Sequence, residues 1–188
     1  YLTALLNLLG PIKRLSGLAS IAIPERTITS KPKFGKKINV QTPDHICGTI
    51  EFEQGAVGTI IQTFATYHAP MDWQNPIMVY GETGTMKVPD PNGFDGPVFI
   101  RNADDKDWQP VEHQFVKGYG RSVGLADMAY AIGSGREHRA NGQQAFAVLD
   151  AMQGFLDSSQ QNKTVTPTIQ YKRPAPMPAH LPFGELDA

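Results

Sequence analysis

The stretch ICGTIEFEQGAVGTIIQTFATY, residues 46–67, predicts two long strands joined by a tight turn. Side chains alternate between the two faces of a strand, so one face of the first strand carries an apolar set: Ile46, Gly48, Ile50 and Phe52. The alternation breaks at residues 53–55, where Gly55 is free to adopt a positive φ. We therefore expect a β-hairpin around which the other elements are arranged.

The second predicted strand, residues 57–66, is rich in β-branched side chains and is apolar on both faces. Val57 and Ile61 share one face, and Ile60 and Phe64 share the other. A strand of this kind is covered on both sides. We expect helices of this chain to cover one side and a second subunit to cover the other.

Composition excludes several classes of protein. The chain has 188 residues, a net charge of −1 and a pI of about 6.6, so nothing in its charge favours binding to nucleic acid or to an anionic membrane. The single cysteine, Cys47, excludes an internal disulfide and fits a reducing, cytoplasmic location. No apolar run approaches the roughly 20 residues that a membrane-spanning helix needs.

The remaining elements follow from the spacing of apolar residues. Leucines at helical spacing predict a helix over residues 1–9, and because this pattern starts at the first residue, which is not Met, we expect a piece of a longer protein. Further strands are predicted at 14–23, 76–81, 85–88, 98–101, 111–116 and 164–168, with a polar, basic loop at 24–37.

Two helices are predicted after residue 120. The first has an apolar stripe at Leu125, Met128, Ala129 and Ile132. The second begins at a capping box formed by Asn141 and Gln144 and has a longer stripe: Ala145, Val148, Leu149, Met152, Phe155 and Leu156. Prolines spaced through residues 173–182 predict an extended arm.

Strands in series followed by helices predict an α+β fold. We expect a large, mostly antiparallel sheet with helices packed on one face and the other face available for oligomerisation. Residues 1–170 would form this domain, and residues 171–188 a proline-rich extended tail.

A G-x-S-x-G motif at residues 120–124 suggests a serine hydrolase with Ser122 as nucleophile. Asp150 or Asp157 and then His180 follow in the order that a catalytic triad of this type uses. A nucleophile elbow, however, requires a parallel sheet upstream, where this chain has hairpins. The alternative is a helix start with Ser122 near the N-cap.

Other motifs are weaker. Glycines at 118, 120 and 124 are similar to a phosphate-binding loop, but a helix follows where a dinucleotide site needs a strand with an acidic residue. The backbone amides of residues 121–123 would suit an anionic or hydroxylated ligand. The five histidines lack metal-ligand spacing, so no metal site is predicted. Arg136, His138 and Arg139 predict a solvated turn rather than a phosphate site.

Several segments together resemble the C-terminal domain of the Gfo/Idh/MocA family, the glucose–fructose oxidoreductase and inositol dehydrogenase group. They occur in the family's order and cover nearly the whole chain: YLTALLNLLGP (1–11), GTIEFEQGAVGTI (48–60), YGETGTMKVPDPNGFDGPV (80–98), GRSVGLADMAYAI (120–132), HRANGQQAFAVLDAM (138–152) and RPAPMP (173–178).

The resemblance implies an oxidoreductase that moves hydride between NAD or NADP and a sugar-like or polyol substrate. The family's dinucleotide domain and its E-K-P lysine are absent here, so we expect no cofactor-binding and no catalytic residue in this chain, and no activity from it alone. The substrate-binding residues it implies are Thr3, Tyr67, His68, Tyr119 and Arg121. Thr3 stands where many members have an Asp.

The same resemblance implies a homodimer or tetramer that pairs through the open sheet face. A serine hydrolase and a non-catalytic binding module remain as alternatives at this point. Fluorophosphonate labelling would distinguish the first, and the upstream gene sequence the second.

Overall fold

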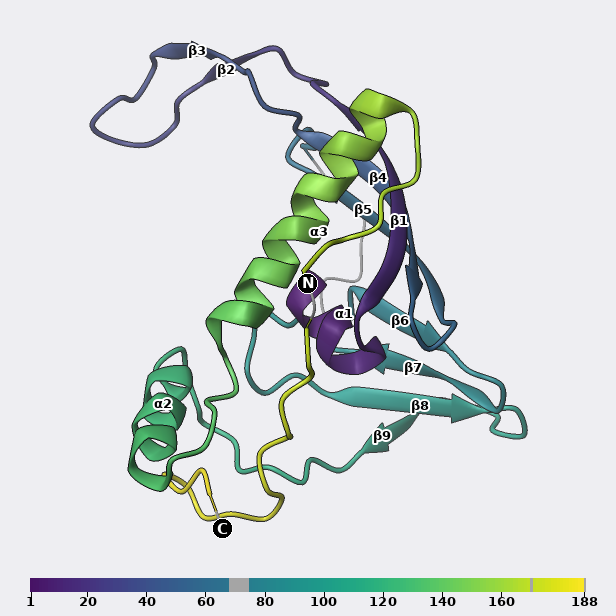
Figure 1. The fold of residues 1–188 in the computed structure, drawn as a ribbon, viewed down its shortest axis with the longest axis vertical. Coiled ribbons are helices and arrows are strands. Elements are labelled where there is room, and N and C mark those ends of the chain that lie inside the picture. The colour runs from purple at the N-terminus through teal and green to yellow at the C-terminus, as the bar shows by residue number, and fades with distance from the viewer. Residues whose placement is uncertain (68–74, 170, 188) are drawn as a thin grey trace. The chain divides into compact units, whose positions relative to one another are not determined.

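A computed structural model describes the chain except for residues 68–74, 170 and 188. Its contacts divide the chain into two compact units, which we describe separately. The first, here called the hairpin unit, comprises Leu2–Ala69 and Gly142–Arg173. The second, the meander unit, comprises Tyr1, Pro70–Asn141 and Pro174–Ala188. All paired strands that the structure describes are antiparallel, which confirms the α+β class (Figure 1).

The hairpin unit is built on a three-stranded sheet of order β1-β4-β5. Its strands are β1 (Ile12–Ser20), β4 (His45–Phe52) and β5 (Val57–Thr63). The turn between β4 and β5 places Gly55 at φ 90°, as the sequence predicts. Val165 forms a two-way backbone bridge with Leu15, so the predicted edge strand near residue 165 is reduced to one bridge.

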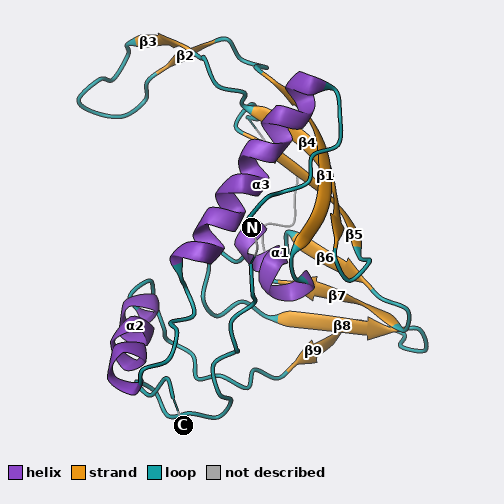
Figure 2. Cartoon of the chain, in the orientation of Figure 1, coloured by secondary structure: helices purple, strands orange, loops and turns teal. Residues whose placement is uncertain are grey.

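Helices α1 (Leu2–Leu9) and α3 (Gly142–Gln161) belong to the same unit, and α3 packs against β1 (Figure 2). The core between them contains Leu2, Leu15, Ile50, Phe52, Ala151 and Phe155. The ring of Phe155 lies directly over two glycines, Gly17 and Gly48, which are paired across β1 and β4. Their missing side chains create the space that lets the helix approach the sheet.

The opposite face of this sheet is open. Leu18 and Ile61 belong to it and are 71% and 70% exposed, and Val57 is exposed beside them. The strand alternation therefore separates a covered face from an uncovered apolar one, as predicted from residues 46–67. Nothing within the described chain covers these side chains.

The predicted loop at residues 24–37 is wrong in part, because its ends form strands. β2 (Glu25–Thr27) pairs with β3 (Lys37–Asn39) in a separate two-stranded sheet. Further backbone bonds join Ile28 to Lys36 and Gly35. The sequence pattern did not predict these strands, because each has only three residues and no apolar face that would give an alternating pattern.

The meander unit contains a four-stranded sheet of order β6-β7-β8-β9. Its strands are β6 (Ile77–Tyr80), β7 (Gly84–Val88), β8 (Val98–Asn102) and β9 (Gln109–Val111). The predicted strand at 111–116 is wrong in its bounds, since pairing ends at Val111. Helix α2 (Val123–Ser134) follows and ends at Gly135, whose φ of 73° is left-handed.

The prediction that the apolar stripe of α2 is buried is wrong. Leu125 and Ile132 are 71% and 78% exposed, whereas Asp127 and Ala131 are buried. The helix is turned this way because the Asp127 carboxylate receives hydrogen bonds from two arginines beyond the helix. The spacing of apolar residues cannot predict a helix face that is fixed by a hydrogen-bonded carboxylate.

The stripe of α3 is correct only in part. Phe155 is buried as predicted, but Leu149 and Met152 are exposed, and the buried positions include Ala147, Ala151 and Gly154. Small residues face the sheet because they allow α3 to lie close to β1. Among the described helices, none combines the length and apolar content required to cross a bilayer.

Candidate substrate-binding surface

Two of the five predicted site residues, Tyr119 and Arg121, lie in the meander unit just before α2. The Tyr119 ring stacks on Phe183 with centroids 5.0 Å apart. Its hydroxyl accepts a hydrogen bond from the Gly184 amide at 3.0 Å and donates to the Glu185 carbonyl at 3.3 Å. Tyr119 therefore holds the C-terminal tail, a role that the sequence did not indicate.

Arg121 lies against the turn that follows β7. Its Nη2 donates to the side-chain oxygen Oδ1 of Asn92 at 3.1 Å. The backbone N–H of Asn92 in turn donates to Asp90 Oδ1 at 2.9 Å. Tyr1 also donates its hydroxyl to Asp90 at 2.9 Å. This hydrogen bond, with partial burial, raises the pKa of Tyr1. The exposed guanidinium is positioned by one bond, which suits a group that hydrogen-bonds to hydroxyls of a ligand.

Two further predicted site residues, Thr3 and Tyr67, belong to the hairpin unit. Thr3 is an exposed residue of α1, and Tyr67 is exposed beyond the end of β5. His68 lies outside the described residues. The structure thus places two site residues in each unit and brings only Tyr119 and Arg121 to one segment.

The hydrolase alternative is not supported. Ser122 has φ −73° and ψ −10°, an ordinary helical conformation rather than the strained turn of a nucleophile elbow. The sheet that precedes it is an antiparallel meander, and β9 ends at Val111, well before the serine. The motif therefore marks the start of α2, as the alternative interpretation of these residues predicted.

An ion-pair network that the sequence analysis missed fixes α2. Arg136 Nη2 lies 2.7 Å from Asp127 Oδ1 and 2.8 Å from Asp187 Oδ1, and Arg139 contacts both carboxylates. The Arg139 amide also donates to Asp127 at 2.7 Å. The prediction of a solvated turn for these arginines is wrong, because both are largely covered.

The charged groups of this network shift the pKa values of Asp127 and Arg136. Burial alone would raise the pKa of Asp127, but hydrogen bonds from Arg136 and Arg139 outweigh it and hold that pKa below its ordinary value. Hydrogen bonds to Asp187 and Asp127 raise the pKa of Arg136. Both shifts favour the charged forms of Asp127 and Arg136, so the network acts as a clamp that fixes the end of α2.

A second missed cluster joins three segments of the hairpin unit. The Gln144 amide donates to Asn7 Oδ1 at 2.7 Å and contacts the Tyr171 hydroxyl at 2.8 Å, and that hydroxyl donates to Asn7 at 2.9 Å. Burial raises the pKa of Tyr171. The one signal in the sequence is the glutamine near the start of α3, which the sequence analysis interprets as part of a capping box with Asn141.

The open sheet face has a cavity of about 240 Å³, lined by polar and apolar residues: Arg14, Leu15, Ser16, Thr49, Ile50, Glu51, Val57 and Thr164. Lys13 lies 2.6 Å from Glu51, and Arg14 contacts the same carboxylate. Hydrogen bonds from Lys13 and then Arg14 hold the pKa of Glu51 below its ordinary value. Within the described ranges, no three acidic, histidine or cysteine side chains are arranged to hold a metal ion.

Comparisons with known proteins give the fold. No family model matches the chain, and no curated protein matches it. Solved structures do match. Apo levoglucosan dehydrogenase is similar with a TM-score of 0.72 at 17% identity, over 90% of this chain and 49% of that one. An aldose–aldose oxidoreductase from Caulobacter crescentus, complexed with glycerol, gives 0.65 at 19%, over 88% and 44%.

An NAD-binding oxidoreductase from Klebsiella pneumoniae is similar with a TM-score of 0.69 at 14% identity, over 89% of this chain and 48% of that one. The chain thus shares its fold with about half the length of these oxidoreductases. At these identities the likeness concerns the fold alone.

The described residues do not fit a dinucleotide. Such a site needs a parallel strand that turns through glycines directly into a helix. Here Gly118 and Gly120 follow a coil after an antiparallel strand, and the Gly118 amide already donates to Asp95. The segment at Gly118 and Gly120 therefore does not form a dinucleotide site.

Proposed function

We propose that residues 1–170 form the substrate-binding and oligomerisation domain, and residues 171–188 the tail, of an NAD(P)-dependent oxidoreductase that acts on a sugar-like or polyol hydroxyl or carbonyl. One observation carries the proposal: about nine-tenths of the chain matches the fold of such enzymes, yet it spans less than half of their length. Levoglucosan dehydrogenase, whose fold is similar, has been solved in complexes with NADH and L-sorbose and with NADH and levoglucosan.

In such a reaction a base removes the hydroxyl proton while hydride leaves the same carbon, and the cofactor supplies the redox chemistry. Within the described residues this chain has donors rather than a base with an orienting partner. Arg121 and Tyr119 offer a guanidinium and a phenol beside one helix start, and Thr3, Tyr67 and His68 are the further proposed contacts. Their role is to bind and orient hydroxyl groups.

Replacement of Arg121 tests the substrate surface. In the full-length enzyme we expect Arg121→Ala to raise KM about tenfold with little change in kcat, since a charge-assisted hydrogen bond contributes on the order of 1.5 kcal/mol. Steady-state kinetics over a panel of polyols and aldoses measures this. Lys117→Ala, an exposed cation four residues earlier, is the matched control. Unchanged kinetics in Arg121→Ala would remove this residue from the site.

We expect the 188-residue chain alone to show no NAD(P)-dependent turnover of any hydroxylated substrate. The reason is that the family resemblance assigns the dinucleotide site and the E-K-P lysine to a domain outside these 188 residues. Measured reduction of NAD or NADP by the purified chain, above a heat-denatured control, would contradict this. If the full-length protein were equally inactive, the non-catalytic binding module would become the better hypothesis.

The open sheet face is the proposed surface for oligomerisation into a homodimer or tetramer. We expect Ile61→Glu to weaken self-association about 100-fold or more, because a buried apolar contact worth about 1.5–3 kcal/mol is lost in both copies. Sedimentation equilibrium measures the change. Leu125→Glu is the matched control, since it is equally exposed but lies on α2. Equal dissociation constants for Ile61→Glu and the parent chain would refute the proposed face.

A further inference from the structure

The β2–β3 hairpin forms a projection from the hairpin unit, which we call the basic arm and define as residues 24–40 (Figure 1). It has five basic residues, Arg26, Lys31, Lys33, Lys36 and Lys37, and one acidic residue, Glu25, so its net charge is +4. The chain totals −1, which leaves −5 for the remainder. The arm is therefore a concentrated positive charge on an otherwise acidic molecule.

The root of the arm is firmly held. Asp44 is buried and accepts hydrogen bonds from the Ala22 amide at 2.7 Å and from Arg26 Nη2 at 2.7 Å. Arg26 Nη2 also donates to the Phe64 carbonyl at 2.7 Å. The hydrogen bond from Ala22, assisted by Arg26, holds the pKa of Asp44 below its ordinary value despite burial.

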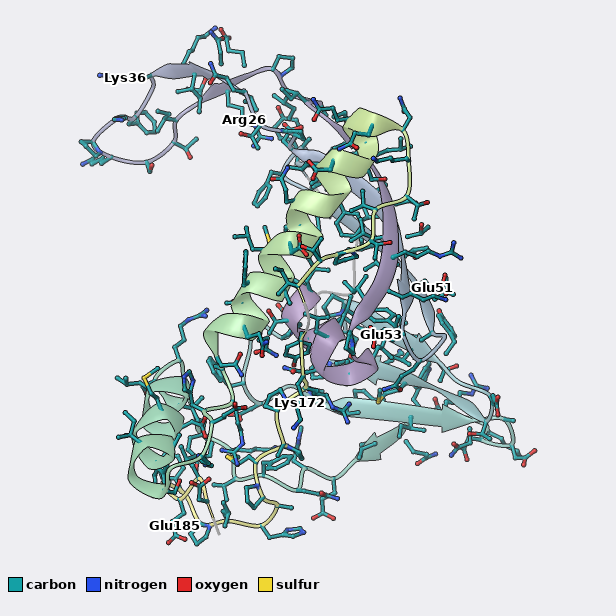
Figure 3. All side chains as sticks on the ribbon, viewed as in Figure 1. Arg26, Lys36, Glu51, Glu53, Lys172 and Glu185 are labelled. Carbon is teal, nitrogen blue, oxygen red and sulfur yellow. The ribbon has the colours of Figure 1, made fainter. Side chains whose placement is uncertain are left out.

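The outer part of the arm is held by backbone bonds that join Ile28 to Lys36 and Gly35 and by an exposed ion pair of Lys37 with Glu25 at 2.6 Å. All residues from 31 to 39 are exposed, and Phe34 is 71% exposed. Figure 3 shows Lys36 far along the arm and Arg26 nearer its root. An isolated two-stranded hairpin is at best marginally stable in water, so a hairpin with an exposed aromatic residue gains stability from a surface that covers it.

A surface of matching chemistry exists on the meander unit. The turn after β6 and the turn after β8 lie at one end of the sheet, because Gly84 pairs with Asn102. This acidic end carries four carboxylates, Glu82, Asp104, Asp105 and Asp107, against two cations, Lys106 and Arg101. Tyr80, which ends β6, is 77% exposed and offers an apolar contact at the same end.

We propose that the basic arm of one copy docks onto the acidic end of a second copy. The lysines meet carboxylates, and Phe34 meets Tyr80, so both the charge and the aromatic part of the arm are matched. A second copy suits the arm better than a nucleic acid, because the rest of the chain carries a charge of −5 that would repel a polyanion. The contact is separate from the open sheet face.

Charge reversal with exchange tests this. One variant carries Lys33→Glu and Lys36→Glu, and another carries Glu82→Lys and Asp104→Lys. Each alone places like charges together, so we expect its self-association at low salt to weaken at least about tenfold. An equimolar mixture restores opposite charges at both contacts and should recover the parent affinity. The control, Lys117→Glu with Lys172→Glu, has the same net charge as the arm variant and should associate like the parent chain.

Cross-linking locates the contact independently of the sheet face. A carbodiimide joins lysine amines to carboxylates that touch, and a mixture of ¹⁴N- and ¹⁵N-labelled chains distinguishes links between copies from links within one. We expect mixed-isotope links between the arm lysines and Glu82, Asp104 or Asp107. Links only within one chain, failure of the mixture to recover, or arm-dependent binding to heparin without self-association would overturn the proposal. None of these readouts depends on oxidoreductase activity.

Discussion

Gly48→Ala is expected to destabilise the chain by about 3 kcal/mol, the upper part of the usual range for overpacking a core. A methyl group at this position would lie 2.7 Å from Phe155 Cδ1, closer still to Cε1, and 3.0 Å from the Ser16 carbonyl oxygen. The ring cannot move away easily, because Phe155 is buried under α3. Urea unfolding followed by circular dichroism measures the loss.

The matched control is Gly58→Ala on the adjacent strand. A methyl group there would meet only Phe52 Cε2, at 3.8 Å, which is ordinary contact, so we expect a change within about 0.5 kcal/mol. Combining Gly48→Ala with Phe155→Leu should cost at least about 1 kcal/mol less than the sum of the single changes. Additive effects would show that the ring does not fill the space above Gly48.

The hairpin was predictable because its information is local. Alternation in β4 put Ile50 and Phe52 on one face, and the structure buries both. The turn at Gly55 needed only a glycine in the right place. The contact of Phe155 with Gly17 and Gly48 was not predictable, because it depends on two strands and a helix more than 100 residues away.

Helix orientation was predicted less well for a physical reason. The periodicity of α2 identified a helix but chose the wrong face, since Leu125 and Ile132 are exposed while Asp127 is buried. A buried carboxylate is tolerated only with partners, and those partners, Arg136 and Arg139, follow the helix. A hydrophobicity pattern cannot report a partner that arrives later in the chain.

The partners of the candidate site residues were likewise not predictable from the sequence. Tyr119 and Arg121 are implied as site residues by the family resemblance, and the structure places both beside loop or tail segments that a single sequence cannot bring together. The sequence predicts an extended tail, and the structure has turns within it at residues 179–180 and 183–184. Its attachment through Tyr119, Phe183 and Asp187 was not predicted and is seen only in the structure. Local chemistry is readable in sequence, whereas its partners depend on tertiary structure.

The second large effect is expected at that attachment: Asp127→Asn should destabilise the meander unit by about 3 kcal/mol, as removal of one partner from a buried ion pair does. The change keeps the shape of the side chain but removes the charge that Arg136 and Arg139 face. The NH2 group of the new asparagine can face the N–H groups of the arginines, so that donor meets donor. Thermal or urea unfolding at neutral pH measures the loss, and Asp104→Asn, an exposed carboxylate, is the control.

The pH dependence separates a charge effect from a packing effect. The folded-state pKa of Asp127 is lowered, so its stabilisation is complete above the unfolded-state pKa of about 3.9 and is lost as the pH falls through the lower folded value. The difference in stability between parent and variant should therefore be largest at neutral pH and shrink below about pH 4. A difference that persists unchanged in acid would mean that the carboxylate acts through shape alone.

The same variant should loosen the tail. Asp187 shares both arginines with Asp127, and the adjacent Leu186 is buried. Without Asp127, Arg136 and Arg139 lose the group that fixes their position, so the last residues should be digested faster by carboxypeptidase. Tail release at an unchanged rate, together with a large loss of global stability, would show that the clamp holds α2 but not the tail.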